Sequence, residues 1–207
     1  MVASAPPRPI PNLTELPLVI QTQRLKLRPI AATDLDDLWP HVSDPALSVH
    51  MSWSAHRDRA ETAAFIAGNV EGLGRGTDLV WAIEIDGKAC GVIGFGGIRW
   101  TFRAWRIDRA ELGYWLGIPH WNQGYMSEAA MAATRFGFET LGLHKITIGC
   151  IEGNTASQKI IEKVGYRYLA KFEDDAWRDG QWWGHLRYEM IASEWGDSTR
   201  TLRFTRR

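Results

Sequence analysis

The features of this chain best suited to chemistry are a carboxylate on an alternating segment and a glycine in the loop that follows it. Glu111 lies in a segment of alternating hydrophobicity, and a short loop containing Gly124 leads from it into a helical pattern. A loop that feeds a helix N-terminus points backbone N–H groups and the positive end of the helix dipole in one direction, which suits a pyrophosphate. A glycine that only turns the chain is the alternative interpretation. The run from Gly94 to Gly97 has neither the Gly-x-Gly-x-x-Gly spacing nor a following helix, and the sequence contains no Gly-x-x-x-x-Gly-Lys-Ser/Thr.

A second polar stretch follows the next strand pattern and reads Asn154-Thr-Ala-Ser-Gln-Lys-Ile-Ile-Glu-Lys-Val-Gly-Tyr166. Together with the loop Trp121-Asn-Gln-Gly-Tyr-Met-Ser-Glu-Ala129, it resembles the GNAT superfamily of acetyl-CoA-dependent N-acetyltransferases over roughly residues 22–195. Within the superfamily, this loop and residues 179–186 (Asp-Gly-Gln-Trp-Trp-Gly-His-Leu) are most similar to the RimJ/RimL type, which acetylates protein N-termini, notably those of ribosomal proteins.

The resemblance implies acetyl-CoA as the co-substrate and a set of residues that bind it. They are Trp115, Leu116, Asn122, Gln123, Gly124, Tyr125, Met126, Ser127, Asn154, Ser157 and Lys163. Trp121 and Met126 stand where the superfamily loop commonly has Gln or Arg and Gly or Ala, but the backbone donors survive both changes. The amide of Asn154 can exchange hydrogen bonds with pantetheine, and a helix N-cap is an equally good explanation of its identity.

Acetyl transfer to an amine needs a neutral nucleophile, a stabilised oxyanion and a proton for the thiolate. Strand periodicity places Glu111, Gly113 and Trp115 on one face, and Glu111 resembles the base of the family, acting directly or through water. A solvated carboxylate or a salt bridge to Arg109 is the alternative.

The acid is less conventional, because Ile161 occupies the place, seven residues after Asn154, of the tyrosine that often protonates the thiolate in this superfamily. Ser157 is the best remaining match. It either protonates the sulfur or only donates a hydrogen bond to it, and a serine that packs a helix turn remains the alternative.

The sequence predicts neither a nucleophilic thiol nor a metal. Cys90 and Cys150 lie inside apolar alternating runs, so we expect buried strand residues without a basic neighbour, in a reducing compartment. The six histidines show no spacing typical of metal ligands, and His120 and His144 are expected to be structural.

Along the segments that position these residues, the spacing of apolar residues alternates between a period of two and a period of 3.6. This predicts an α+β domain with a strongly bent mixed sheet. The resemblance implies one GNAT-like domain in which a splayed central strand pair is flanked by helices. Strands are expected at 24–29, 79–85, 89–98, 107–116, 145–151, 166–173 and 182–191, and helices from 33 and over 59–70, 126–141 and 155–164. Asp86-Gly87 and Asp179-Gly180 are predicted turns, and Gly142 and Gly165 are predicted helix ends.

Composition divides the chain into a Pro-rich N-terminal arm (1–18) outside the core, an acetyltransferase domain (19–195) and a basic C-terminal tail (196–207). The 24 Lys and Arg balance the 24 Asp and Glu, which excludes direct nucleic-acid binding through a basic arm as the main theme. No stretch approaches the roughly 18 apolar residues of a membrane span, so we expect a soluble cytoplasmic protein.

The function expected from these features is direct acetyl transfer to the α-amine of a protein or peptide, including a ribosomal protein N-terminus. A small-molecule amine acetyltransferase (polyamine, amino acid or aminoglycoside) and a non-catalytic acyl-CoA-binding module remain alternatives. Eleven tryptophans, several of them in predicted loops, favour a homodimer. The acidic residues Glu173 to Asp175 and Asp179 form either a charged turn or an acidic lip that attracts a cationic amine.

Overall fold

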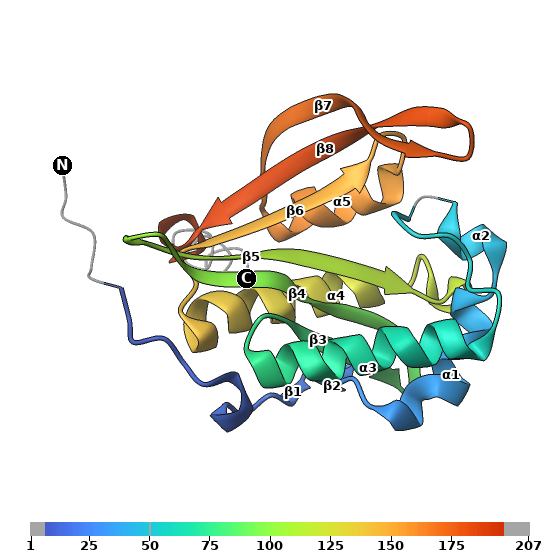
Figure 1. Cartoon of the computed structure of the whole chain (residues 1–207), viewed down its shortest axis with the longest axis horizontal. Coiled ribbons are helices and arrows are strands. Elements are labelled where there is room, and N and C mark those ends of the chain that lie inside the picture. Colours follow the sequence, from blue (N-terminus) through green and yellow to red (C-terminus); the bar gives the residue numbers. More distant parts are fainter. Residues whose placement is uncertain (1–6, 50, 197–207) are drawn as a thin grey trace, which may run out of the picture.

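A strongly bent sheet forms the centre of the molecule (Figure 1). The structure is a computed structural model that describes residues 7–49 and 51–196. The strands are β1 (Ile20–Gln21), β2 (Lys26–Pro29), β3 (Leu79–Ile85), β4 (Lys88–Phe102), β5 (Trp105–Leu116), β6 (Lys145–Ile151), β7 (Arg167–Arg178) and β8 (Gln181–Ile191). Their order across the sheet is β1-β2-β3-β4-β5-β6-β8-β7, and among the described strands only β5 and β6 pair in parallel.

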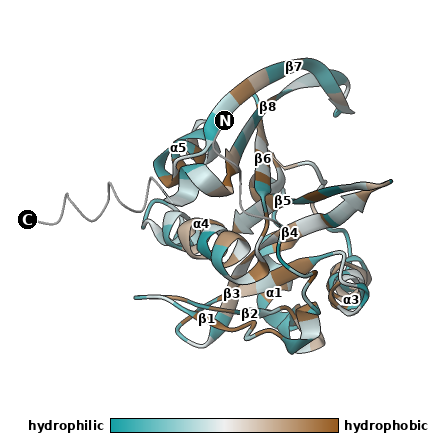
Figure 2. Cartoon of the chain, turned by 90° about the vertical axis from the view of Figure 1, so that its left-hand side faces the viewer, coloured by the Kyte–Doolittle hydropathy of each residue, from teal (hydrophilic) through white to brown (hydrophobic). Residues whose placement is uncertain are grey.

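Helices cover both faces of this sheet. They are α1 (Leu35–Val42), α2 (Pro45–Ser48), α3 (Arg59–Arg75), α4 (Tyr125–Phe136) and α5 (Thr155–Val164), with short turns η1 (Leu13–Glu15), η2 (Ala32–Asp34) and η3 (Ile118–His120) and a π-helical end to α4, η4 (Gly137–Leu141). Alternate residues of β3 point to opposite faces of the sheet. On one face Trp81 packs against Phe136 of α4, and on the other Ala82 belongs to the same buried cluster as Ile66 of α3. In Figure 2 the sheet accordingly runs between α4 and α3.

The predicted turns are confirmed by the backbone. Asp86 and Gly87 have φ of 50° and 81°, and Asp179 and Gly180 have φ of 52° and 81°, so both hairpins close on two residues with positive φ. This is the turn whose twist matches that of the flanking strands. The helix ends at Gly142 and Gly165 are confirmed as well.

Several elements differ from the prediction: α2 was not expected, and α3, β4 and β7 run past their predicted ends, β4 to Phe102. Helix α3 continues beyond residue 70 to Arg75, because the interior glycines did not end it and Gly76 caps it instead. Strand β7 continues through the acidic residues predicted to be a connection, and the extra length is accommodated by an irregularity between Phe172 and Ala176 at which Asp174 has a φ of 47°.

The predicted arm contributes to the core, contrary to expectation. Leu13, held in the turn η1, is 2% exposed, and the indole N–H of Trp81 donates to the carbonyl oxygen of Leu18 at 2.6 Å. The free energy gained by burying the Leu13 side chain outweighs the preference of the surrounding prolines for an extended chain. Of the predicted tail, all but Gly196 lies outside the described residues.

The parallel pair opens part of the way along its length. Pairing of β5 with β6 runs from Arg109 opposite Lys145 to Leu112 opposite Ile148 and then ends, although both strands continue. Figure 1 shows the two strands diverging beyond this point. The predicted splay is therefore confirmed, and it frees backbone and side chains of both strands for a ligand.

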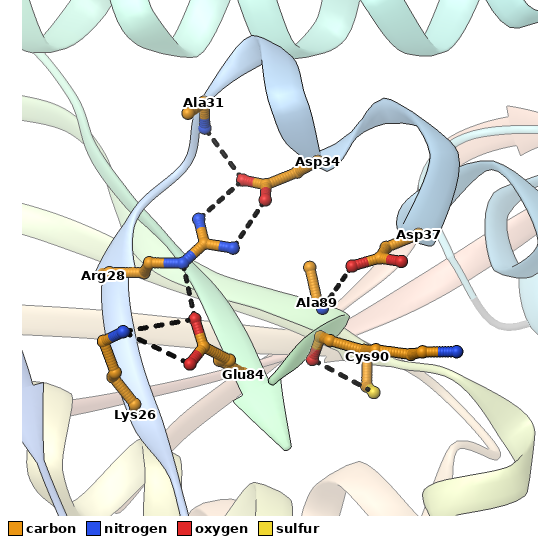
Figure 3. Close-up of polar contacts among 9 residues, drawn as sticks. Lys26, Arg28, Ala31, Asp34, Asp37, Glu84, Ala89 and Cys90 are labelled. Atoms are coloured by element: carbon orange, nitrogen blue, oxygen red, sulfur yellow. Dashed lines mark hydrogen bonds and ion pairs between the residues drawn. The ribbon is translucent and has the colours of Figure 1, made fainter. Parts of the chain in front are cut away.

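A network of ion pairs fixes the entry to α1 (Figure 3). Arg28 donates to both oxygens of Asp34, at 2.9 and 2.6 Å, and to Glu84 at 2.7 Å. Hydrogen bonds from Arg28, against the opposing effect of burial, lower the pKa of Glu84. The network joins β2, β3 and the turn before α1, so it sets where α1 lies on the sheet.

No helix in the described ranges is long and apolar enough to cross a membrane.

Candidate active site at the splayed strands

A cavity of about 1090 Å³ lies where β5 and β6 separate. Residues 109–116 of β5 and 147–151 of β6 line it, as do the loop before α4, the first half of α5, and side chains from α3 and β8. Its volume is slightly above the usual range of ligand pockets, so it can hold a large or a two-part ligand. One wall consists mainly of backbone and helix starts, and another consists of charged side chains.

The backbone wall is the loop before α4, which we call the cradle (residues 121–127). Gly124 is the N-cap of α4 with a φ of 79°, and Asn122 has a φ of 58°. The N–H groups in the first turn of a helix have no acceptor within the helix and lie at the positive end of its dipole. The cradle is thus suited to an anion such as a pyrophosphate, as the sequence predicted.

The guanidinium group of Arg24, which the sequence did not predict as part of the site, lies beside the cradle. Arg24 donates to the carbonyl oxygen of Gln123 at 2.8 Å, pairs with Glu128 at 2.7 Å, and lies 4.5 Å from the ring centroid of Tyr125. Although burial acts to raise it, hydrogen bonds from Thr22 and Arg24 lower the pKa of Glu128. No local motif signals Arg24, because its partner Glu128 lies 104 residues away.

The structure brings together all but two of the predicted cofactor-binding residues. Trp115, Leu116, Asn122, Gly124, Tyr125, Met126, Ser127, Asn154 and Ser157 line the cavity. Gln123 does not, since its side chain donates to the carbonyl oxygen of Pro119 at 3.0 Å. Lys163 ends α5 on an exposed position, and Lys159, one turn earlier, lines the cavity instead.

The start of α5 places a hydroxyl pair in the cavity. The side chain of Asn154 accepts from the Ser157 N–H at 3.0 Å, so the N-cap interpretation of Asn154 is confirmed. Ser157 is 8% exposed, and its Oγ lies 3.0 Å from the phenol oxygen of Tyr114 on β5. Burial raises the pKa of Tyr114, whereas its hydrogen bond with Ser157 acts to lower it.

No local signal in the sequence marks Tyr114, because the family pattern places the hydroxyl on the helix after Asn154 and not on the strand. The place seven residues after Asn154 holds Ile161, which is fully buried in the core and points no functional group at the cavity. On β5, period two assigns Tyr114 to the face opposite Glu111. Where the strands separate, both faces of β5 line the cavity, so the two side chains reach the same space.

The charged wall is formed around Glu111, whose side chain is 56% exposed. Its Oε1 lies 2.9 Å from Nη1 of Arg187 on β8, so the suggested salt bridge to Arg109 is wrong. Arg187 also lies 3.5 Å from Asp175, and Asp175 lies 3.1 Å from Nδ1 of His185, which is close but does not form an aligned hydrogen bond. Arg187 and His185 line the cavity beside Glu111.

Three of the four acidic residues predicted to form a turn or a lip in the last hairpin, Glu173, Asp175 and Asp179, are paired with bases. Glu173 lies 3.0 Å from Lys171, and Asp179 lies 2.9 Å from Arg178. Arg178 also donates to the carbonyl oxygen of Ser48 at 2.7 Å, which joins the hairpin to α2. The charged-turn interpretation accounts for these contacts better than an acidic lip does.

Both cysteines are buried strand residues, as expected. Burial raises the pKa of Cys150 to about 11, against a lowering hydrogen bond from Ser157, and burial also raises that of Cys90. The expectation that no basic residue lies beside either is wrong for Cys90. His41 and His120 offer nitrogen atoms within 4.8 Å of its sulfur and of each other. Burial, and secondarily His120, lowers the pKa of His41.

Comparison with known proteins gives a family and a set of relatives. Residues 24–167 match the family model described as an acetyltransferase (GNAT) domain. The chain is 32% identical over 85 residues to the uncharacterized N-acetyltransferase YnaD of Bacillus subtilis, which covers 41% of this chain and 50% of the relative. It is 28% identical over 106 residues to the ribosomal protein uS5-alanine N-acetyltransferase of Escherichia coli, with 51% and 52% covered. The chain thus spans about half the length of these two relatives.

Among solved structures, the fold matches that of RimL, a ribosomal L7/L12 α-N-protein acetyltransferase in complex with coenzyme A. The TM-score is 0.74 to 0.75 over two crystal structures, and the complex is 21% identical, covering 85% of this chain and 99% of that one. At this identity the match shows the fold alone. It confirms the α+β architecture with a mixed sheet between helices.

Proposed function

The chain belongs to the GNAT acetyltransferase family and is an N-acetyltransferase, and on this premise we propose that it acetylates the α-amine of a protein or peptide N-terminus. The observation that carries the proposal is the single cavity that joins the cradle to the carboxylate of Glu111 across the splayed strands. The activities of the Escherichia coli relative and of the structural neighbour RimL support the acceptor class, since both are acetyltransferases of ribosomal proteins.

The backbone wall fits the co-substrate acetyl-CoA. The cradle offers N–H donors from Asn122 to Ser127 for the pyrophosphate, and Arg24 adds a positive charge held by Glu128. The proposed contacts further along are Trp115 and Leu116 of β5 and the amide of Asn154, with Lys159 taking the place expected for Lys163. When bound, acetyl-CoA would supply the thioester carbon that the amine attacks.

Glu111 is the proposed base. An ammonium group cannot attack, so a carboxylate oxygen of Glu111 takes the proton, directly or through one water. Arg187 holds that carboxylate at 2.9 Å and so fixes its direction into the cavity. A positioned general base contributes roughly 10² to 10⁴ in rate.

Ser157 is the proposed hydrogen-bond donor to the departing sulfur, and Tyr114 is the proposed positioning residue. Because burial raises the pKa of Tyr114, its phenol stays protonated at neutral pH. It can therefore donate to Ser157 Oγ, 3.0 Å away, which leaves the serine proton free to turn toward the sulfur.

Thiol release from acetyl-CoA in the presence of an acceptor panel tests the proposal. The panel holds peptides with free N-termini, the same peptides blocked at the α-amine, polyamines, amino acids and aminoglycosides. We expect turnover with the free peptides and none with the blocked ones. Turnover on the small amines alone would assign the small-molecule alternative, and coenzyme A binding without turnover on any amine would assign a non-catalytic module.

The remaining expectations stand as parts of this proposal. Of the boundaries, the catalytic domain at 19–195 and the tail at 196–207 are kept, whereas residues 13–18 of the arm pack with the domain. Self-association is supported by Trp177 and Trp182, which are 60% and 56% exposed and lie with ring centroids 5.5 Å apart near the tip of the β7–β8 hairpin. The mass in solution over a wide range of concentrations tests it, and a monomer throughout would refute it.

A further inference from the structure

Three metal-ligating side chains meet next to the cradle, and one of them, His120, also lines the cavity. His41 comes from the last turn of α1, Cys90 from the start of β4, and His120 from the end of η3. Their ligating atoms all lie within 4.8 Å of one another. The three positions are far apart in the sequence, which is why no ligand spacing revealed them.

The position of His41 requires a glycine on the neighbouring segment. A Cβ at residue 117 would lie 2.5 Å from the Nδ1 atom of His41, so only glycine leaves room for this ring. The N–H of Gly117 also donates to the carbonyl oxygen of Cys90 at 2.8 Å. The same backbone segment thus places the imidazole and the thiol side by side.

Neither imidazole has a protein partner that would explain its place as a polar side chain. Across residues 7–49 and 51–196, no hydrogen bond or ion pair reaches the ring nitrogens of His41 or His120, although both rings are half-buried. The rings lie edge to face with centroids 6.1 Å apart. The ring nitrogens of both residues are therefore free to bind a ligand beside the thiol.

We propose that His41, Cys90 and His120 bind one Zn²⁺ ion. A thiolate with two imidazoles is a donor set typical of zinc, with Zn–S near about 2.3 Å and Zn–N near about 2.0 Å. Tetrahedral bonds of those lengths separate ligand atoms by roughly 3.3 to 3.6 Å, so side-chain movements of about 1 Å close the site. The fourth position is left to water or to a carboxylate oxygen.

Asp37 is a carboxylate near the cluster, although its oxygens are not among the ligand atoms that lie within 4.8 Å of one another. It lies one turn before His41 on α1, and its Oδ2 accepts the Ala89 N–H at 3.0 Å, next to Cys90 (Figure 3). A zinc ion bound to one thiolate carries a net single positive charge, which a carboxylate at this place would neutralise. Such a partner is typical of metal sites, where nearby carboxylates orient and balance the ligands.

The ion would add a direct link between three segments that otherwise meet through packing and through two hydrogen bonds, from the Ala89 N–H to Asp37 and from the Gly117 N–H to the Cys90 carbonyl oxygen. His120 directly precedes the cradle, so a metal held from α1 and β4 would fix where the cradle begins. The role inferred for the ion is therefore structural and lies beside the acetyl-transfer site.

Metal content and affinity test the proposal without any measurement of turnover. The purified full chain is stripped with a chelator and titrated with Zn²⁺ against a chromophoric competitor, and with Co²⁺ as a spectroscopic probe. We expect one zinc per chain and a thiolate-to-cobalt charge-transfer band. Cys90→Ser should abolish the band and weaken zinc binding by at least about 100-fold, since even outer-shell losses cost 10- to 100-fold.

Matched variants separate ligand loss from general damage. Cys150→Ser removes the other buried thiol and should keep both the charge-transfer band and the zinc affinity. His144→Gln should also keep both. His120→Gln should weaken zinc binding, as Cys90→Ser does. His120 is half-buried, so its variant remains informative if Cys90→Ser fails to fold. No zinc bound to the wild-type chain, or equal affinity in wild type and the Cys90 and His120 variants, would overturn the proposal.

Discussion

The cradle and the charged wall face one cavity, but they are built in different ways. In the cradle, the groups offered to a ligand are backbone N–H donors set by the positive φ of Asn122 and Gly124 and by the start of α4. In the charged wall, the groups are side chains from two strands, Glu111 and Arg187, which are 76 residues apart and meet through an ion pair of 2.9 Å.

This difference determines which substitutions each region tolerates. A backbone cradle accepts a change of side chain as long as the dihedral angles are kept, which explains how Trp121 and Met126 can replace the usual residues. A wall of side chains depends on each functional group and on the register that brings the strands together. The four predictions below test this contrast, beginning with the largest expected effect.

The first concerns the charged wall. Glu111→Gln keeps the shape of the side chain and removes the proton acceptor, so kcat should fall by roughly 10² to 10⁴ while coenzyme A affinity stays unchanged. Steady-state kinetics and calorimetry measure the two effects. Glu173→Gln is the matched control, because the Glu173 carboxylate lies outside the cavity and is paired with Lys171. Near-normal kcat in Glu111→Gln at neutral pH would show that another group is the base.

The second concerns the cradle. Gly124→Val places a β-branched residue at a φ of 79°, where its Cβ would also lie 3.4 Å from Arg24. A strain of about 1 to 3 kcal/mol should weaken coenzyme A binding by roughly 10- to 100-fold. Trp121→Gln changes a larger side chain in the same loop and should alter the affinity by no more than about twofold. Equal, small losses of coenzyme A affinity in both variants, measured by calorimetry, would show that the pyrophosphate binds outside the cradle.

Local pattern was enough to predict the bounds of several elements around the cavity. The bounds expected for α5, β3 and β6 agree with the structure, because each segment has a clear period and a glycine or turn at its end. The splay and the cavity followed from the resemblance of these segments to a family.

Contacts between distant segments could not be predicted in the same way. Arg24 beside Glu128, Arg187 beside Glu111, and His41 beside Cys90 each depend on how strands and helices register against one another. A one-residue change of register moves a strand side chain to the other face, so neither composition nor spacing specifies such pairs. The buried Leu13 shows the same limit, since its socket is built by residues elsewhere in the chain.

The third prediction concerns the hydroxyl between the two walls. Ser157→Ala should lower kcat by roughly tenfold at pH 7, the low end for a hydrogen bond to a charged group. A thiolate leaves without a proton near its own pKa of about 8.5, so the loss should shrink as the pH rises toward that value. A pH–rate profile of wild type and variant measures it. A loss that stays constant across this range would argue that Ser157 only packs the turn of α5.

The last and smallest effect is expected at Tyr114, which reaches Ser157 from β5. Tyr114→Phe keeps the ring and removes one hydrogen bond, so kcat should fall by about 2- to 10-fold with little change in KM. Because the phenol acts through the serine, the same substitution in the Ser157→Ala background should cost nothing further, and a double-mutant cycle measures this coupling. Tyr166→Phe is the matched control, since Tyr166 is a buried tyrosine whose hydroxyl pairs with Thr134. If the losses at Tyr114 and Ser157 multiply, Tyr114 contributes to the cavity independently of Ser157.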